Sequence, residues 1–196
     1  MFNLNSIKML LLKKNNKNHV FIEGELKVLG YLPYFKTPKN GKVFLGENVV
    51  LNSDFKRTNT ALTYRCKFVT GYDGVIKIGK HTMLNGVCIV SYENVEIGEE
   101  CQIASSTIIS DTDFHPVEPT LRSKQVKGEN FPFSSVGKKA IKIGNNVWIG
   151  WNCTILKGVV IGDDCIVAAG SVVLAGSYPK GSLIAGNPAK VIKSYI

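Results

Sequence analysis

Residues 143–174 read IGNNVW IGWNCT ILKGVV IGDDCI VAAGSV VL when they are divided into blocks of six. The first position of every block is aliphatic, and this column consists of Ile143, Ile149, Ile155, Ile161, Val167 and Val173. A helix would repeat its apolar residues at three and four positions, and a strand at two. The second position is small in four blocks: Gly144, Gly150, Gly162 and Ala168. The stretch therefore predicts a corner repeat, in which one aliphatic residue points inward, a short strand follows and the chain turns.

Repeats of this length are typical of β-helix solenoids, whose stacked units share a core that no unit could form alone. The stretch also contains V-W-I-G at 147–150 and A-G-S-V-V at 169–173, and A-G-N-P-A-K follows at 185–190. This combination resembles the hexapeptide-repeat acyltransferases. The resemblance implies an all-β fold, a left-handed parallel β-helix of triangular cross-section with three hexapeptides per coil. The handedness rests on the resemblance alone, because parallel crossovers are generally right-handed.

The bulk composition fits one ordinary globular domain of 196 residues with a formal net charge of +9. Such a charge suits an anionic ligand, nucleic acid or an acidic membrane face, although the lysines could simply solvate the outer faces. No common nucleic-acid motif is present. The apolar run 9–12 is too short to span a bilayer and lacks a signal-peptide cleavage site, so we expect a cytoplasmic protein.

The cysteines are expected to be reduced packing residues. Four of the five stand at the fifth position of a hexapeptide, where other blocks have Val or Ser: Cys88, Cys101, Cys153 and Cys165. There is no C-x-x-C pair, which a zinc site or a disulfide framework would favour.

The chain divides into three parts. Residues 1–44 are predicted to form an N-terminal cap and irregular strands, with a short helix around Ile7 and Leu10–Leu12 covering the open end of the solenoid. A weak membrane-surface anchor is the alternative for this helix. Residues 45–177 are predicted to form the β-helix, interrupted by an inserted loop at 115–140 that is too polar and proline-rich to be a coil. Residues 178–196 form a C-terminal tail. Long loops in compact domains are usually functional or disordered.

His115 begins the inserted loop in the string HPVEPTLR. The sugar O-acetyltransferases of the maltose, galactoside and nodulation type carry a similar H-P-x-D/E-P-x-x-R string, and its histidine is their general base. Acyl transfer from a thioester to a hydroxyl needs a group near neutral pKa to take the hydroxyl proton, and imidazole suits this. His115 could also be an ordinary loop residue; His19 and His81 are expected on the surface. Because no serine elbow or Cys/His pair is present, we expect direct attack without an acyl-enzyme.

The resemblance also assigns acceptor-binding residues. Asn85, in MLNG, matches the asparagine that contacts the acceptor, although it could be a solvated surface residue. Asp111 and Asp113 are expected to orient His115 or to bind the acceptor; the alternative is that they accept hydrogen bonds from loop amides. Trp148 is expected to shape the acyl pocket or to pack between subunits.

For the donor, the resemblance implies acetyl-CoA lying in a groove between subunits of a homotrimer. Gly150 and Ala169 match positions whose backbone groups pair with the pantetheine arm, and Trp151 lies near the expected thioester. Lys190 and Lys193 match basic residues that bind the phosphates. The chain departs from the family at Leu174-Ala175, where Thr-Lys is frequent. Lys180 or a lysine of a neighbouring subunit would then replace one phosphate contact.

The sequence thus predicts an O-acetyltransferase acting on a saccharide hydroxyl, possible acceptors being cell-surface poly- or oligosaccharides. The alternatives are an N-acetyltransferase of an amino sugar or nucleotide sugar, and an antibiotic O-acetyltransferase. Two further alternatives are a non-enzymatic trimeric scaffold and a metal-binding β-helix of the carbonic anhydrase kind. Three scattered histidines argue against the metal site.

Overall fold

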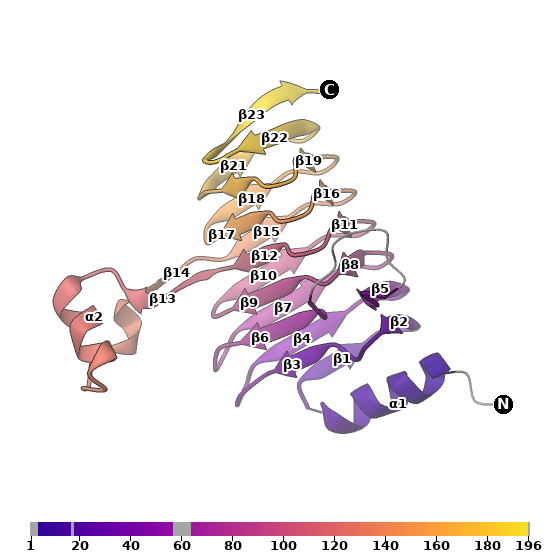
Figure 1. The fold of residues 1–196 in the computed structure, drawn as a ribbon, viewed down its shortest axis with the longest axis horizontal. Coiled ribbons are helices and arrows are strands. Elements are labelled where there is room, and N and C mark those ends of the chain that lie inside the picture. The colour runs from indigo at the N-terminus through magenta and orange to yellow at the C-terminus, as the bar shows by residue number, and fades with distance from the viewer. Residues whose placement is uncertain (1–3, 17, 57–63, 196) are drawn as a thin grey trace.

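The computed structural model describes residues 4–16, 18–56 and 64–195. Its strands form three long parallel sheets, which we call sheets A, B and C and which stack as a solenoid (Figure 1). Consecutive strands enter sheet A, then sheet B, then sheet C, and the order repeats along the chain. Each coil therefore has three sides separated by corners.

Sheet A holds β1 (Val20–Ile22), β4 (Lys42–Leu45), β7 (Val75–Ile78), β10 (Asn94–Ile97), β15 (Ile141–Ile143), β18 (Val159–Ile161) and β21 (Gly176–Tyr178). Sheet B holds β2 (Leu26–Gly30), β5 (Val49–Ser53), β8 (Met83–Asn85), β11 (Gln102–Ile103), β16 (Trp148–Ile149), β19 (Ile166–Val167), β22 (Ser182–Gly186) and the antiparallel β23 (Ala189–Ser194). Sheet C holds β3 (Tyr34–Lys36), β6 (Lys67–Thr70), β9 (Cys88–Ser91), β12 (Ile108–Ser110), β17 (Thr154–Leu156) and β20 (Val172–Val173).

The aliphatic column of the hexapeptides lines the interior of the solenoid, as predicted. Its members pair across neighbouring coils, one coil of three hexapeptides apart: Ile143 with Ile161, Ile149 with Val167, and Ile155 with Val173. All six side chains are buried. Parallel strands buried against one another need such aliphatic inward positions. The left-handed sense of the winding stays a prediction from the resemblance.

The small residues at the second position of the hexapeptides let neighbouring coils approach each other. A Cβ added at Gly144 would lie 2.7 Å from Asp163 N of the next coil, and one at Gly150 would lie 2.6 Å from Ala169 N. The corner between sheets A and B also needs a residue with positive φ, as at Asn146 (52°). Asn tolerates this left-handed conformation better than most residues. His81 (57°) takes the same corner position and is exposed, which agrees with a surface role.

The coils begin earlier than the sequence indicated. Residues 20–44, predicted to be irregular, form β1 to β4, and β1 pairs in parallel with β4 from Val20↔Val43 onward. The parallel ladder of sheet A therefore already includes strands before residue 45. Corners of unequal length separate these strands, so their inward residues do not recur every six positions.

The helix α1 (Leu4–Asn15) lies against the first coil. Lys8 Nζ donates to the carbonyls of Val28 (3.2 Å) and Gly30 (2.5 Å), and Leu12 is buried in the core. These contacts satisfy part of the exposed edge of β2, which would otherwise be free to pair with another chain. None of the helices in the described ranges is both long and apolar enough to cross a membrane.

Candidate active site

An arm leaves the solenoid where sheet C passes into sheet A, between β12 and β15 (Figure 1). It consists of β13 (Thr112–Pro116), α2 (Pro119–Val126), the 3₁₀ helix η1 (Phe133–Ser135) and β14 (Val136–Lys138). The strands β13 and β14 pair antiparallel, and Lys139 N donates to Asp111 O at 2.9 Å to close the base. The loop predicted at 115–140 therefore starts earlier and is ordered. Its helix α2 escaped prediction because it buries no side chain and shows no apolar face.

Asp111 lies at the base of the arm and is completely buried. Its carboxylate accepts hydrogen bonds from Ser91 Oγ (2.9 Å) and from the backbone amides of Tyr92 (2.6 Å) and Glu93 (2.9 Å). Burial raises the pKa of the Asp111 carboxyl, and these hydrogen bonds oppose the shift. Asp111 therefore accepts hydrogen bonds from backbone amides, which is the alternative given for it above. Its buried side chain does not reach solvent to bind a substrate.

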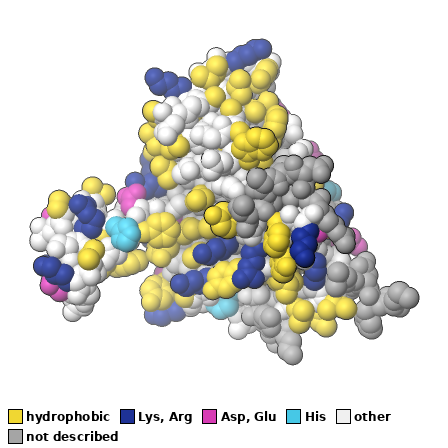
Figure 2. All heavy atoms as spheres, in the orientation of Figure 1, with side chains coloured by type: hydrophobic (Ala, Val, Ile, Leu, Met, Phe, Trp, Pro, Cys, Tyr) yellow, Lys and Arg dark blue, Asp and Glu magenta, His cyan; other side chains and the backbone are white. Residues whose placement is uncertain are grey.

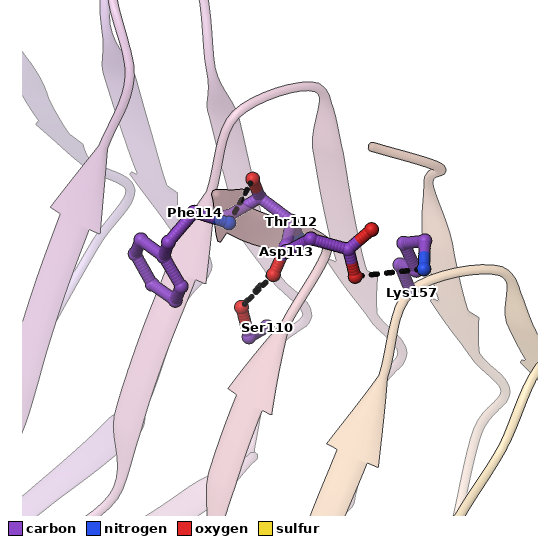
Figure 3. Close-up of polar contacts among 5 residues, drawn as sticks. All are labelled: Ser110, Thr112, Asp113, Phe114 and Lys157. Carbon is purple, nitrogen blue, oxygen red and sulfur yellow. Dashed lines mark hydrogen bonds and ion pairs between the residues drawn. The ribbon is translucent and has the colours of Figure 1, made fainter. Parts of the chain in front are cut away.

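Asp113 fastens the arm to the next coil (Figure 3). Its Oδ1 lies 2.7 Å from Lys157 Nζ, and both side chains are partly exposed. The next residue, Phe114, has φ of 61°, and the pairing of β13 with β14 shifts register over the same residues. Bulges of this kind re-aim side chains and are frequent beside active sites. Asp113 thus holds the start of the arm, and the irregularity at Phe114 sets the direction of the following residue, His115.

His115 is exposed in β13, and the residues after it fold back towards it. The Glu118 carboxylate caps α2 by accepting from Thr120 N (2.8 Å) and Leu121 N (2.6 Å), which lowers the pKa of Glu118. Arg122 Nη1 donates to Val117 O at 2.7 Å and to Pro116 O at 3.3 Å. The residues of the H-P-x-E-P-x-x-R string therefore form a local structure. Glu118 caps the N-terminus of α2, and Arg122 links α2 to the end of β13, the strand that carries His115.

Sequence reasoning missed Gln125, which contacts the imidazole. Its Oε1 lies 2.9 Å from His115 Nδ1, and its Nε2 donates to Phe114 O at 3.2 Å. No motif marks Gln125, because the contact depends on how α2 docks on β13. The structure therefore adds one residue to the surroundings of His115 and removes Asp111 from them.

A hollow of about 430 Å³ opens at the base of the arm. Its wall combines aromatic rings with polar side chains and includes Tyr72, Tyr92, Phe133, Asp73, Ser134 and Lys138. Tyr92 stacks on Phe133 with ring centroids 6.1 Å apart, and it meets Phe114 edge-on at 5.9 Å. Figure 2 shows hydrophobic side chains gathered where the arm joins the body. Phe114 thus contacts a wall residue of the hollow, whereas His115, the next residue of β13, is not among the residues that line it. None of its wall residues was singled out from the sequence.

The predicted donor residues lie together on the C-terminal half of sheet B and its corner with sheet C. One cross-strand line runs from Trp148 through Ile166 and Leu183 to Lys193. Adjacent strands are about 4.8 Å apart, so this line is about 14 Å long. Lys190 is exposed on the same strand as Lys193, while Trp151 and Ala169 lie at neighbouring corners, linked by Gly170 N donating to Trp151 O. The two indole side chains are more than half exposed, Trp148 by 54% and Trp151 by 57%.

The backbone groups of Gly150 and Ala169 differ in whether they are free to form a hydrogen bond with a ligand. Gly150 N donates to Val167 O, and Gly150 O accepts from Thr107 Oγ1, so both groups are already hydrogen-bonded within the solenoid. The exposed amide of Ala169 has no hydrogen-bond partner among the residues that the structure describes. Ala169 N can therefore donate to a ligand, whereas at Gly150 only the second lone pair of the carbonyl remains.

In one chain, the two groups of predicted residues are separated. The arm with His115 leaves from the edge between sheets C and A, and in a three-sided coil this edge lies opposite sheet B (Figure 1). Asn85 ends β8 on sheet B, where its side chain accepts from Asn52 Nδ2 (3.0 Å) and donates to Ile103 O (3.3 Å). A single chain therefore presents the proposed base on one side, and Asn85 with the donor residues on the other.

Within residues 4–16, 18–56 and 64–195, no cluster of three His, Cys, Asp or Glu side chains could hold a metal ion. Burial raises the pKa of the Cys66, Cys101 and Cys153 thiols, and all five cysteines are free. A thiol with a raised pKa is a poor nucleophile at neutral pH. These three thiols are therefore poor candidates for a nucleophile.

Comparison with known proteins finds one family model and several relatives. Residues 140–175 match the family model described as bacterial transferase hexapeptide (six repeats). This part of the chain therefore carries the hexapeptide repeat of those transferases. It is 39% identical over 125 residues to WbbJ of Escherichia coli K12, named as a lipopolysaccharide biosynthesis O-acetyl transferase, and the match covers 62% of each chain. It is 38% identical over 123 residues to the galactoside O-acetyltransferase of the same strain, covering 62% of this chain and 55% of that protein.

One solved structure extends the comparison to a donor complex. A hexapeptide-repeat acetyltransferase from Vibrio cholerae O1 biovar eltor, complexed with acetyl coenzyme A, has a TM-score of 0.54 and 30% sequence identity; the match covers 66% of this chain and 65% of that one. The chain spans less than two thirds of the length of the two curated relatives.

Proposed function

We propose that this hexapeptide-repeat protein is an acetyl-CoA-dependent O-acetyltransferase that acts on a saccharide hydroxyl, with His115 as general base. The acceptor oxygen attacks the thioester carbonyl while the imidazole takes the hydroxyl proton. The carbon–sulfur bond then breaks, and the coenzyme A thiolate leaves and recovers the proton from the imidazolium. No acyl-enzyme is needed, because the acetyl group passes directly from sulfur to oxygen.

The observation that carries this proposal is the position of His115. It is exposed at the root of a structured arm, and the H-P-x-E-P-x-x-R string builds that structure through the Glu118 cap and the Arg122 contacts. A histidine held this way can meet a substrate without unfolding anything. Relatives named as O-acetyltransferases and a neighbour complexed with acetyl coenzyme A support the reaction type.

The aromatic hollow at the base of the arm is the proposed acceptor site. Sugar rings present apolar C–H faces and polar edges, so a wall of aromatic rings interspersed with hydroxyl, carboxylate and ammonium groups suits them. Tyr72 and Phe133 are both more than half exposed there. Lys39 lies over the Tyr72 ring at 4.6 Å and Lys138 lines the wall, so the hollow also tolerates an acidic sugar.

Acetyl-CoA is proposed to lie along sheet B of a neighbouring subunit. Its extended pantetheine arm would follow the line from Trp148 towards Lys193, with Ala169 N donating to one of its carbonyls and Trp151 beside it. Lys190 and Lys193 would meet the phosphates. Lys180, the proposed substitute for the family lysine, already pairs with Asp164 at 3.2 Å. A homotrimer of left-handed β-helices brings the arm of one chain to sheet B of the next, which resolves the separation found within one chain.

The test is a thiol-release assay with acetyl-CoA against panels of sugars, amino sugars and glycans. We expect turnover on a hydroxyl acceptor. The His115→Ala variant should lose at least about 100-fold in kcat, because a positioned general base contributes about 10²- to 10⁴-fold, while its affinity for acetyl-CoA stays unchanged.

The matched control is His81→Asn, which changes an exposed histidine on a corner where asparagine tolerates the positive φ. It should keep full turnover. Full turnover by His115→Ala would remove His115 from the role of base, and transfer only to amines would replace the O-acetyltransferase by an N-acetyltransferase.

A further inference from the structure

Gln125 lies in α2, ten residues after His115, and is partly buried between the helix and β13. Its amide bridges two groups of β13: Oε1 lies 2.9 Å from His115 Nδ1, and Nε2 donates to Phe114 O at 3.2 Å. A side-chain amide therefore contacts the Nδ1 side of the proposed base.

The second of these contacts fixes the orientation of the amide. Phe114 O is a backbone carbonyl and can only accept a hydrogen bond, so the end of Gln125 that faces it must be the NH₂ group. The opposite end, facing His115, is then the carbonyl oxygen. Amide orientation is ordinarily ambiguous, but here the surrounding network decides it.

The orientation of Gln125 in turn fixes the tautomer of His115. A carbonyl oxygen only accepts, so His115 Nδ1 must carry the proton that is donated to Gln125 Oε1. In the neutral imidazole, Nε2 is then unprotonated and has its lone pair free. A general base needs such a nitrogen on the side that meets the hydroxyl.

Polar contacts orient Gln125, and α2 has no fully buried side chain. Glu118 caps the helix through Thr120 N and Leu121 N, and Arg122 Nη1 ties it to Val117 O. The helix therefore serves as a support that brings one amide to the imidazole.

We propose that Gln125 is a positioning residue that holds His115 in the Nδ1–H tautomer, with Nε2 ready to take the acceptor proton. This inference rests on the proposed function, in which His115 is the base. A purely structural role, in which Gln125 only closes the arm, makes a different prediction: removing it would alter the stability of the arm but neither the tautomer nor the pH dependence of turnover.

The test combines ¹⁵N NMR of the histidine side chains with kinetics. The chain has three histidines, so the spectrum of His115→Ala assigns the His115 signals. We expect neutral His115 to be protonated at Nδ1 in the wild type and to shift towards the Nε2–H form in Gln125→Leu. In that variant kcat should fall about tenfold, the effect of losing one orienting hydrogen bond, with the KM for the acceptor unchanged.

Gln125→Glu separates the effect of the hydrogen-bond acceptor on the His115 tautomer from the effect of charge beside the imidazole. It retains an acceptor for Nδ1–H, so the tautomer should stay, but its negative charge favours the imidazolium over the neutral ring. The acidic limb of the kcat profile should therefore move to higher pH. Lys124→Ala, on the neighbouring exposed position of α2, should change neither the tautomer nor the profile.

A wild-type His115 protonated at Nε2, or a Gln125→Leu variant with unchanged tautomer and kcat, would overturn the inference. The two proposals fail separately, because the tautomer is measured without substrate. If Nδ1 carries the proton and His115→Ala still turns over fully, the proposed function fails and the hydrogen bond to Gln125 remains.

Discussion

The carboxylate of Asp111 lies at the point where the arm leaves the solenoid, and Ser91, Tyr92 and Glu93 all donate to it. Its pKa is raised by burial, so the folded protein holds a proton on this group at pH values where the unfolded chain has lost it. Between the ordinary pKa of an aspartate and the raised one, the folded state binds more protons. The contribution of Asp111 to the free energy of unfolding therefore decreases as the pH rises through this window.

Asp111→Asn tests this. The variant places an NH₂ group against donors that need an acceptor, so we expect a loss of about 1–3 kcal/mol in the free energy of unfolding. Urea denaturation of both proteins across this window and up to neutral pH measures it. The stability difference between wild type and variant should shrink as the pH rises, because only the wild type titrates at this position. A difference that grows with pH would mean that the pKa of Asp111 is lowered.

His115 and Gln125 show what the sequence could and could not supply at this scale. His115 follows from a string of neighbouring residues, since H-P-x-E-P-x-x-R folds locally. Gln125 could not be found in this way, because its contact with the imidazole exists only after α2 has formed and docked. Asp111 differs again: a buried carboxylate that binds amides and an exposed one that binds a substrate have the same sequence signature.

The arm is the element on which the proposed chemistry depends, and a few polar contacts fasten it to the solenoid. Asp113 pairs with Lys157 of the next coil, and Lys138 Nζ donates to Tyr92 O at 3.3 Å (Figure 3 shows the first contact). Because these groups are partly exposed, each contact stabilises the fold by at most about 1 kcal/mol. Their main effect is to fix the direction of β13.

Asp113→Ala should therefore separate stability from activity. We expect its free energy of unfolding to change by less than about 1 kcal/mol, while kcat/KM for the acceptor falls about tenfold because His115 loses its position. Glu99→Ala is the matched control, since it breaks another exposed pair, Lys80–Glu99 at 3.3 Å, away from the arm. The control should leave kcat/KM unchanged. An equal loss of activity in both variants would show that the Asp113 contact has no special part in the site.

Prediction of the elements succeeded where the pattern is periodic. The column from Ile143 to Val173 predicts the coils because each inward position must meet its equivalent one coil away. Between Val20 and Leu45 the corners differ in length, so the pairing of β1 with β4 appears only when the coils are stacked. The helix α2 shows no apolar periodicity, since none of its side chains is fully buried and its first turn is capped by Glu118.

At the scale of the whole molecule, the three-sided winding separates the arm of a chain from its own sheet B. The arm projects from the edge opposite sheet B, while Trp148, Ala169 and Lys193 lie on sheet B or its corner. The proposed homotrimer would place each arm against the sheet of its neighbour and make three equal sites. The sequence contains the parts of this site, but only the topology shows that they face in opposite directions.

Subunit mixing tests this central claim most directly. One variant carries His115→Ala and the other carries Lys190→Glu with Lys193→Glu; each alone should be inactive in acetyl transfer. When the two are co-expressed in equal amounts with different tags and the mixed trimers are isolated, a site that takes its base from one chain and its donor lysines from the next is intact at about one interface in three. The account predicts recovery of about a third of wild-type turnover. No recovery from two inactive parents would place the base and the donor site in the same chain and contradict it.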